Sequence, residues 1–600
     1  MSPHDHDSEH PCEHDHDHDH EDVSEDDFPE PTAEEIFGPR VPPEPVFLQA
    51  GPVSLQFDPE WGVLRRFQVG GREALRAIYP AVRSDKWRTA PPRISQLEVE
   101  SAGDSFRLSF ICEHVDAESG VDFAWRGEVA GAPDGTVTYG FDGAARAPMR
   151  TNRTGLCVLH PSLPTAGRPV TVSHGDGREE VARFPSLISP HQPFFDVAAL
   201  AHEVVPGVAV RVAFEGEVFE TEDQRNWTDA SFKTYGGALA KPIPLSLAAG
   251  HPVRQKVTFS LTAAAPLPAP PADAGPVRVT LPDEAITPLP GVGTRFAPEV
   301  GEPVPALVDP LRTLALGHVL VDVDLTAGGW RESLALGRRW ADALGARVLL
   351  RVIFTPNHQP ALAALAAEWA EAPGRLLAVS VVHPGEACPG AVTLGLVAAA
   401  MGRVAPAAPV ASAPADNFAD MNRFRPSPEF WAAPPMCPQV HTFDHESMME
   451  NIEAQPALLA TARSFNPHPL LVGPVTLLRR RVPDPRQRSL FAAAWTAGSM
   501  AAVLPLGLAM AVTYHEHAGP MGVVGTPCEG VFEGLAGMTH AAPTLVSDPS
   551  TVAALTVFAP GGERRVLLAN LTRWTVEIIL GDDDESVFEF GPYATAWLDA

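Results

Sequence analysis

Residues 318–354 read HVLVDVDLTAGGWRESLALGRRWADALGARVLLRVIF and decide the fold of this chain. The two ends, 318–325 and 346–354, are short apolar runs typical of buried strands in a parallel sheet. The stretch between them, 328–345, spaces its apolar residues as an amphipathic helix does. A strand, a helix and a second strand in this order predict one unit of an α/β fold.

The same alternation continues through residues 277–535. Strand-like runs are separated by helical stretches such as 328–345, 358–373 and 446–465. The eight runs are 289–296, 318–325, 346–354, 376–383, 408–414, 437–444, 470–477 and 510–516. Eight strand–helix units in about 250 residues predict a (β/α)8 TIM-like barrel. The alternative is an open parallel sheet, but no glycine-rich phosphate loop follows any of the runs.

Strand alternation also flanks the barrel on both sides. Residues 46–262 contain short alternating runs, such as FRLSFICEHV (106–115), separated by turn signals. This pattern predicts an antiparallel β-sandwich domain. A Pro/Ala-rich segment at 263–276 has the composition of a linker, and residues 536–600 predict a small C-terminal β-domain.

Residues 1–45 form a His/Asp/Glu-rich tail that we expect to be disordered. The segment 1–39 holds fifteen acidic side chains and no Lys or Arg, so it supplies half of the formal net charge of −30. Seven His among the first twenty residues could chelate zinc or nickel loosely, although a solvating extension is the simpler interpretation. No basic patch stands out and the chain has only four Lys, so neither nucleic acid nor an anionic membrane is an expected partner.

One apolar segment, 489–514, is long enough to cross a bilayer without a charge. Pro505 and Gly507 interrupt it, which favours a helix, a turn and a strand in a soluble core. The tail lacks the positive and apolar regions of a signal peptide. The six Cys are scattered without a CxxC pair, so we expect free thiols in a reducing cytoplasm.

Polar side chains follow the predicted strands at their carboxyl ends, where the active site of a (β/α)8 barrel lies. They are Asp322, Asp324, His383, Glu386, Asn417, Asn422, His441, Asp444, Tyr514, His515 and Glu516. Each could also be a packing or capping residue, and Asp322 could be held by Arg351. Their expected convergence at one mouth favours a site.

A second candidate region is FETEDQRNWTDASFKTY, residues 219–235, which lies late in the N-terminal β-domain. The segment is too charged for a core strand unless its charges are paired, and too poor in Gly, Ser and Pro for a plain loop. One interpretation is a structural knot fastened by local Glu222–Arg225 and Asp229–Lys233 ion pairs. The other is the wall of a polar site. The substrate-binding side chains would then be Glu222, Asp223, Arg225, Asn226 and Trp227.

The three-part architecture is similar to that of retaining glycosidases, which need two carboxyl groups about 5 Å apart. Barrel families with that chemistry place the pair after strands four and seven. Here Glu386 follows the fourth run only beyond His383, and the seventh ends GPVTLLRRR (473–481) with no acid. The scaffold is therefore predicted without its usual catalytic pair.

Several motifs together resemble the D-apionate lactonase family, bacterial enzymes that open a branched-pentose lactone. EDQRNWTDASFKTY (222–235) is the most specific. The others are IYPAVRSDKW (78–87), PPRI (91–94), PHQPFFDVAAL (190–200), NFADMNRFRP (417–426), PQVHTFDHES (438–447), GPVTL (473–477) and TYHE (513–516). The likeness runs through residues 46–600. The chain departs from the pattern at His515, where an aromatic is expected, and at the Ala-rich 411–416.

The resemblance implies lactone hydrolysis, which needs a base for the attacking water, donors for the oxyanion and an acid for the leaving alkoxide. We expect Glu516 to be the base, because low-dielectric walls at the end of an apolar strand raise its pKa. His441 and Asp444 would supply the acid and orient it. Further contacts to sugar hydroxyls are expected from Asn417, Asn422, Tyr514 and His515.

No cofactor is expected, although a divalent metal could replace the base. The expected partner is a small sugar lactone, and the oligomeric state is open. Two other functions also stay open: a glycoside hydrolase with unusual acid placement, and a carbohydrate-binding protein whose barrel has lost its catalytic function. Glu516 could instead pair with an arginine and only brace the barrel.

Overall fold

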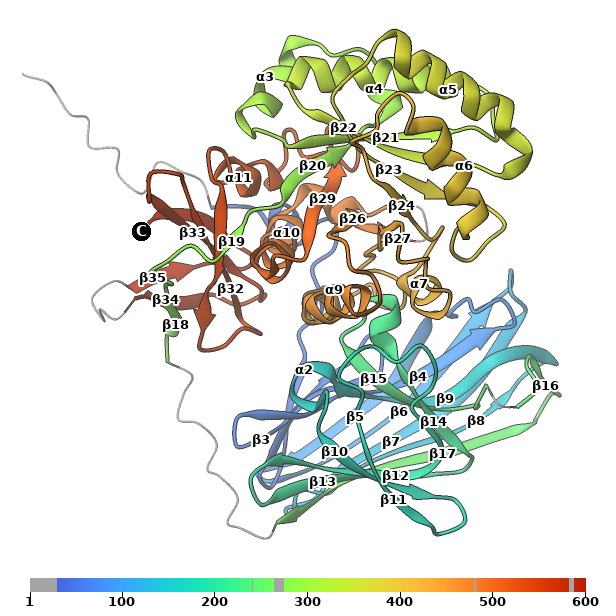
Figure 1. Ribbon diagram of the computed structural model, residues 1–600. Helices are drawn as coiled ribbons and strands as arrows, with labels where there is room; N and C mark the ends of the chain where they lie inside the picture. The colour runs from blue at the N-terminus through green and yellow to red at the C-terminus, as the bar shows by residue number, and fades with distance from the viewer. Residues whose placement is uncertain (1–29, 240, 264–274, 480–481, 582–586) are drawn as a thin grey trace, which may run out of the picture.

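The structure is a computed structural model that describes residues 30–239, 241–263, 275–479, 482–581 and 587–600. Figure 1 shows three parts: an N-terminal β-domain at the bottom of the view, a (β/α)8 barrel at the top and a C-terminal β-domain at the left. Helices α7 (Phe418–Arg423) and α9 (Ala454–Phe465) lie between the barrel and the N-terminal sheet.

Eight parallel strands form the predicted barrel, paired in the order β25-β24-β23-β22-β21-β20-β29-β26. A bridge between Met436 and Val475 brings the two ends of this order together, so the barrel is nearly closed. The strands are β20 (Gly291–Arg295), β21 (His318–Asp324), β22 (Arg347–Ile353), β23 (Leu376–Val382), β24 (Val410–Ser412), β25 (Trp431–Ala432), β26 (Leu470–Val475) and β29 (Ala509–Glu516).

Helices cover the outside of this barrel. In addition to α7 and α9 they are α3 (Pro305–Thr313), α4 (Trp330–Leu344), α5 (Gln359–Glu371), α6 (Ala391–Met401), α8 (His445–Glu450), α10 (Leu490–Val503) and α11 (Cys528–Glu533). Val321 and Val323 of β21 pack in the large core with these helices, whereas Leu320 packs with Leu349 in a separate inner cluster. Asp322 lies on the same inner side as Leu320, because side chains two residues apart share a face.

The sixth strand differs from the prediction. The sequence places it at 437–444, but the structure has β25 at Trp431–Ala432 and a loop at 437–444. Pro434, Pro435 and Pro438 lack the N–H that an inner strand must donate, which explains why the ladder ends so early. The side chains expected at the end of this strand therefore sit on a loop.

Residues 489–514 form a helix, a turn and a strand, as predicted. The helix α10 is buried along most of its length, a 3-10 turn at Leu504–Leu506 follows it, and Gly507 turns the chain at positive φ into β29. Within the described ranges no helix is both long and apolar enough to cross a membrane.

The N-terminal domain is antiparallel, as expected, but hydrogen bonding joins its strands into one seventeen-stranded sheet and not into the two sheets of a simple sandwich. The strands are β1 (Val46–Ala50), β2 (Val53–Asp58), β3 (Val63–Val69), β4 (Arg72–Ser84), β5 (Pro92–Ala102), β6 (Ser105–Asp116), β7 (Val121–Gly131), β8 (Val137–Ala145), β9 (Met149–Pro161), β10 (Pro169–His174), β11 (Glu179–Arg183), β12 (Phe194–Val205), β13 (Val208–Glu215), β14 (Phe219–Asp223), β15 (Ser231–Gly236), β16 (Leu245–Leu247) and β17 (Pro252–Ala263).

Four of these strands, β4, β9, β15 and β14, lie side by side in that order. Ile78 and Val158 point into the main core of the domain. Their neighbours Tyr79 and Cys157 cluster with Tyr235 away from that core, on the opposite face of the sheet. This second face carries the polar groups described below.

The C-terminal domain has a four-stranded and a five-stranded sheet. Two of its strands precede the barrel: β18 pairs with β34, and β19 with β30. Part of the range 277–535 therefore hydrogen-bonds with the C-terminal strands. The strands are β18 (Val277–Thr280), β19 (Thr287–Pro288), β30 (His540–Pro543), β31 (Leu545–Val546), β32 (Val552–Phe558), β33 (Arg564–Asn570), β34 (Val576–Leu580), β35 (Val587–Phe590) and β36 (Thr595–Asp599).

Residues 30–45 belong to the predicted disordered tail, but they are part of the fold. Thr32 and Glu35 form a capping box that starts helix α1 (Ala33–Phe37). Phe37 is buried against Tyr593 and His445. A capped turn with an apolar anchor is enough to dock this segment, whereas residues 1–29 of the predicted tail lie outside the described ranges.

Candidate functional site

The motif 219–235 is a β-hairpin whose charges are nearly all buried. Strand β14 leads into a 3-10 turn, η2 (Gln224–Trp227), and β15 returns. Thr228 adopts a left-handed conformation with φ of 66° after the turn. Because buried charges are costly unless they are paired, the partners of each group show what the hairpin does.

Hydrogen bonds and an ion pair hold the tip of the hairpin in place. Arg225 forms a bidentate ion pair with Asp223, with N–O distances of 2.8 and 2.7 Å. It also donates hydrogen bonds to the carbonyls of Pro185 and Ser186. Asn226 accepts a 3.0 Å hydrogen bond from the side-chain amide of Asn422 in α7. The expected substrate contacts Asp223 and Arg225 are thus engaged within the N-terminal domain. Asn226 and Asn422 are engaged in joining the two domains. Asn417 stands before α7 and makes no side-chain cap.

The strands of the hairpin carry a different arrangement. Glu222 lies directly opposite Lys233 and forms an ion pair with it. Asp229 pairs with His441 of the barrel loop, so the pairs expected from the sequence, Glu222–Arg225 and Asp229–Lys233, do not form. In a hairpin, residues directly across the ladder are closer than residues three or four apart along it.

Several cations surround Glu222. Burial alone would raise the pKa of Glu222, but the charges of Lys233 and Arg153 outweigh burial and hold it at about 2. Burial lowers the pKa of Lys233 although Glu222 opposes that shift. Arg153 of β9 stacks on Tyr235, with its guanidinium carbon 3.6 Å from the ring centre.

His441 and Asp229 form a dyad between the two domains. The Nδ1 atom of His441 is 2.5 Å from Oδ2 of Asp229, while the other oxygen of Asp229 accepts a 3.1 Å bond from Asn451. Trp227 packs edge-on against the imidazole, with ring centres 5.6 Å apart. The side chain of His441 keeps 17% of its surface exposed, and in the described part of the chain its Nε2 makes no hydrogen bond.

The His441 imidazole is held in its neutral form. Burial lowers its pKa below the ordinary value, Asp229 opposes this, and the charges of Lys233 and Arg83 lower it further. Lys233, Arg153 and Arg83 stand on the neighbouring strands β15, β9 and β4, and we call these three cations the cationic strip. Because the charges of Lys233 and Arg83 act on the imidazole, the dyad lies beside this strip. We call the whole group the interdomain cluster; its members are Arg83, Arg153, Glu222, Asp229, Lys233, Tyr235 and His441.

A second polar group lies inside the carboxyl end of the barrel, and we call it the mouth cluster: Arg295, Asp322, Arg351 and Glu516. Asp322 accepts from Arg351 at 2.6 and 2.9 Å and from Arg295 at 2.9 Å. Burial would raise the pKa of Asp322, but the two arginines outweigh it and lower the pKa. The structure therefore contains the expected contact in which Arg351 holds Asp322.

Glu516 reaches this cluster because β29 contains a bulge. The register against β20 shifts between Gly293 and Arg295, and His515 has a φ of 49°. A bulge reverses the face on which the following side chain points, so Glu516 meets Arg295 at 3.3 Å. Burial raises the pKa of Glu516 to about 7, against the opposing charge of Arg295.

Tyr514 and His515 face helix α10 instead of the mouth. The hydroxyl of Tyr514 is 3.0 Å from that of Ser499, and Nε2 of His515 is 2.8 Å from the Thr496 hydroxyl. Both residues are fully buried there. His383 and Glu386 contact each other at 3.6 Å beyond the fourth strand.

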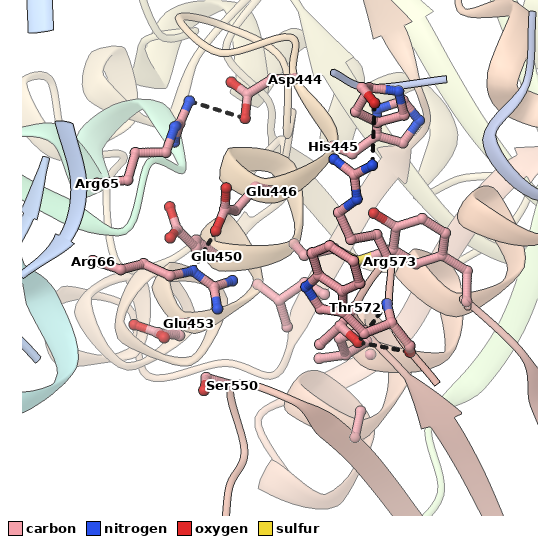
Figure 2. A pocket seen from close by; sticks show the side chains of 18 of the residues that line it. Arg65, Arg66, Asp444, His445, Glu446, Glu450, Glu453, Ser550, Thr572 and Arg573 are labelled. Atoms are coloured by element: carbon pink, nitrogen blue, oxygen red, sulfur yellow. Dashed lines mark hydrogen bonds and ion pairs between the residues drawn. The ribbon is translucent and has the colours of Figure 1, made fainter. Parts of the chain in front are cut away.

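Asp444 lines a separate cavity of about 750 Å³. It caps α8 by accepting from the Ser447 N–H and pairs with Arg65 at 3.1 Å. Figure 2 shows this cavity, with Asp444, Arg65 and Arg66 on one side and Arg573 of the C-terminal domain on the other. Burial would raise the pKa of Asp444, but the charge of Arg65 and the hydrogen bonds from Ser447 outweigh burial and lower the pKa. Among the described residues, the ion-pair partner of His441 is Asp229 and that of Asp444 is Arg65.

The structure thus separates the three residues expected to act in catalysis: Glu516 lies in the mouth cluster, His441 in the interdomain cluster and Asp444 at the cavity. In the described ranges no hydrogen bond, ion pair or ring contact joins Glu516 to His441 or Glu222. The sequence suggested only a local ion pair with Asp229 for Lys233 and no role for Arg83, Arg153 or Tyr235, although all but Arg153 stand within motifs quoted for the resemblance. The same ranges contain no group of three His, Cys, Asp or Glu side chains that could hold a metal ion.

Comparison with known proteins covers both large domains. The family model described as "D-apionate lactonase, N-terminal domain" matches residues 35–264, and "D-apionate lactonase, TIM barrel domain" matches 292–483 and 479–547. A D-apionate lactonase of Brucella anthropi is 31% identical over 518 residues, which are 80% of this chain and 83% of the relative.

The solved structures that this chain matches are more distant. A family 39 glycoside hydrolase of Bacteroides cellulosilyticus WH2 has a TM-score of 0.39 and 11% identity, covering 76% of this chain and 98% of that one. A GH51 arabinofuranosidase of Xanthomonas axonopodis pv. citri has a TM-score of 0.38 and 13% identity, covering 51% and 88%. Similarity at this level indicates neither a substrate nor a mechanism.

Proposed function

The chain belongs to the D-apionate lactonase family, and from this premise we propose that it hydrolyses D-apionolactone or a closely related sugar lactone to the open hydroxy acid. The observation that carries the proposal is the Asp229–His441 dyad beside the cationic strip of the N-terminal sheet. A neutral imidazole with one nitrogen held by a carboxylate is the arrangement that accepts a proton from water.

In the proposed reaction, Nε2 of His441 removes a proton from the attacking water, whose oxygen bonds to the lactone carbonyl carbon. Asp229 holds the tautomer and stabilises the imidazolium that forms. The imidazolium then returns the proton to the ring oxygen as the carbon–oxygen bond breaks. His441 thereby serves as base and acid in turn, and no further reactant is consumed.

Lys233 is the group best suited to stabilise the oxyanion that forms on the lactone carbonyl oxygen. Its ammonium is buried with Glu222, and its charge acts on His441. A fixed cation in a poorly solvated site stabilises a developing negative charge without having to reorganise. Glu222 keeps Lys233 in place, and its ionised oxygens can accept from sugar hydroxyls.

Glu516 is the second candidate for the base. Its pKa of about 7 would make it half-ionised at neutral pH, which suits a general base. Its neighbours, however, are the members of an ion-pair network, and Arg295 is shared with Asp322. We therefore assign the base to His441 and retain Glu516 as the alternative to be tested.

The proposal is tested by incubating the protein with a panel of five- and six-carbon aldonolactones and of aryl glycosides. We expect acid release from a branched or five-carbon lactone, measured by titration at constant pH and corrected for spontaneous hydrolysis. A chelator should leave the rate unchanged, because the proposed route uses side chains and water. Chromogen release from an aryl glycoside without acid release from any lactone would contradict the proposal.

A further inference from the structure

Two arginines stand side by side on the face of the N-terminal sheet that carries the interdomain cluster. Arg83 of β4 and Arg153 of β9 are direct partners across the ladder. Both are more than nine-tenths buried, with 7% and 3% of their surface exposed. Two like charges this close repel each other, so their placement needs a compensating group.

Among the described residues, no acidic side chain forms an ion pair with either guanidinium. In the described part of the chain, neither guanidinium makes a hydrogen bond or an ion pair, and the Nε atoms of both are enclosed without a partner. The nearby acid, Glu222, is already paired with Lys233. Other buried arginines behave differently: Arg225 and Arg486 each hold a carboxylate with two nitrogens.

The position of Arg153 keeps its edge available. Its guanidinium lies over the ring of Tyr235 at 3.6 Å and 5.5 Å from the ring centre of Trp87. Stacking occupies the flat face of a guanidinium and leaves the N–H groups along its edge to donate. Trp87 is 39% exposed, so solvent reaches the ring beside Arg153.

We infer that Arg83 and Arg153 form a carboxylate-binding subsite that holds the hydroxy acid produced by the reaction. The inference rests on the proposed function for the identity of the acid. Hydrolysis adds water to a neutral lactone, and the new acid loses its proton to give a carboxylate. Two buried guanidinium groups match that charge with paired N–H donors, whereas the lactone group of the substrate carries no charge.

Binding of the acid can be measured without any turnover. We would titrate D-ribonate and ribitol into the wild-type protein by calorimetry, because the two compounds share their hydroxyl pattern and differ in the carboxylate. Ribonate should bind about 10- to 100-fold more tightly, the range expected for charge-assisted hydrogen bonds, and should competitively inhibit lactone hydrolysis. Equal affinities would overturn the inference.

Arg83→Met gives the second readout. Since removal of an unpaired buried charge relieves its desolvation, the variant should melt at or above the wild-type temperature without ligand and should lose the preference for ribonate. A matched Arg126→Met change at an exposed arginine of the same sheet should keep that preference. Lower stability of Arg83→Met with unchanged ribonate binding would show a structural role.

These measurements separate the inference from the proposed function. Ribonate preference in a protein that hydrolyses no lactone would support the subsite and refute the lactonase reaction. Lactone hydrolysis without a preference for ribonate would refute the subsite alone.

Discussion

The mouth cluster and the interdomain cluster contain similar side chains but arrange them differently. In the mouth cluster, Arg295, Asp322, Arg351 and Glu516 form a connected set of ion pairs. In the interdomain cluster, Arg83 and Arg153 lack an anion, and His441 has one nitrogen without a partner in the described ranges. Buried polar groups are normally satisfied, so the unsatisfied cluster indicates a ligand and the satisfied one a brace.

The largest expected effect tests the dyad. His441→Gln keeps a polar side chain but cannot accept and return the proton, so kcat should fall by about 10²–10⁴-fold. The fold should persist, as judged by melting and circular dichroism. His383→Gln, at a histidine outside both clusters, serves as the control. Activity within a few-fold of wild type for His441→Gln would remove the dyad from the mechanism.

The next largest effect concerns stability. It tests whether the tip of the hairpin has a structural role, in contrast to its strands, which carry the proposed catalytic groups. Arg225→Met leaves Asp223 buried without its partner, which typically costs about 3–5 kcal/mol in the free energy of unfolding. Urea denaturation should show this loss, while the folded fraction keeps its KM. A normal melting curve with a raised KM would place Arg225 in the substrate pocket.

Glu516→Gln should change kcat by only a few-fold if the mouth cluster is a brace. The difference in stability between this variant and the wild-type protein should depend on pH. The native pKa of about 7 lies above the ordinary value of 4.5, so the wild-type protein loses stability as pH rises from about 4.5 to 7. Relative to wild type, the variant should gain up to about 1.4 kcal/mol per pH unit across that window. A flat difference between the two melting profiles would contradict this.

The smallest effect is expected at Asp444. Asp444→Asn retains a good helix cap but loses the charge that faces Arg65. We expect a modest fall in melting temperature and turnover within a factor of two. A hundredfold loss of turnover would return Asp444 to the catalytic group and move the site toward the cavity of Figure 2.

The barrel could be predicted because each of its strands and helices has a sequence pattern within a short stretch of the chain. Apolar runs such as 318–325 and 346–354 carry the strand signal within a few residues, and the helix between them has its own period. The sixth strand was misplaced because VHTF at 440–443 has the composition of a strand, while the prolines at 434, 435 and 438 determine where the ladder stops.

The site was only partly predictable, because its contacts join distant parts of the chain. Asp229 and His441 are 212 residues apart, and no spacing rule connects them. Within the hairpin, neighbours along the sequence suggested Glu222–Arg225, whereas the ladder pairs Glu222 with Lys233. Glu516 was placed correctly at the end of a strand, but the bulge at His515 that turns it inward leaves no pattern in the sequence.

The pH dependence of kcat/KM tests most directly whether the dyad or Glu516 is the base. A base must be deprotonated, so the rate rises with pH through its pKa and then levels off. If His441 acts, the midpoint lies below the ordinary imidazole value of about 6.5, because burial, Lys233 and Arg83 lower its pKa. The same midpoint should remain in Glu516→Gln. A midpoint near 7 that disappears in Glu516→Gln would contradict the dyad and identify Glu516 as the base.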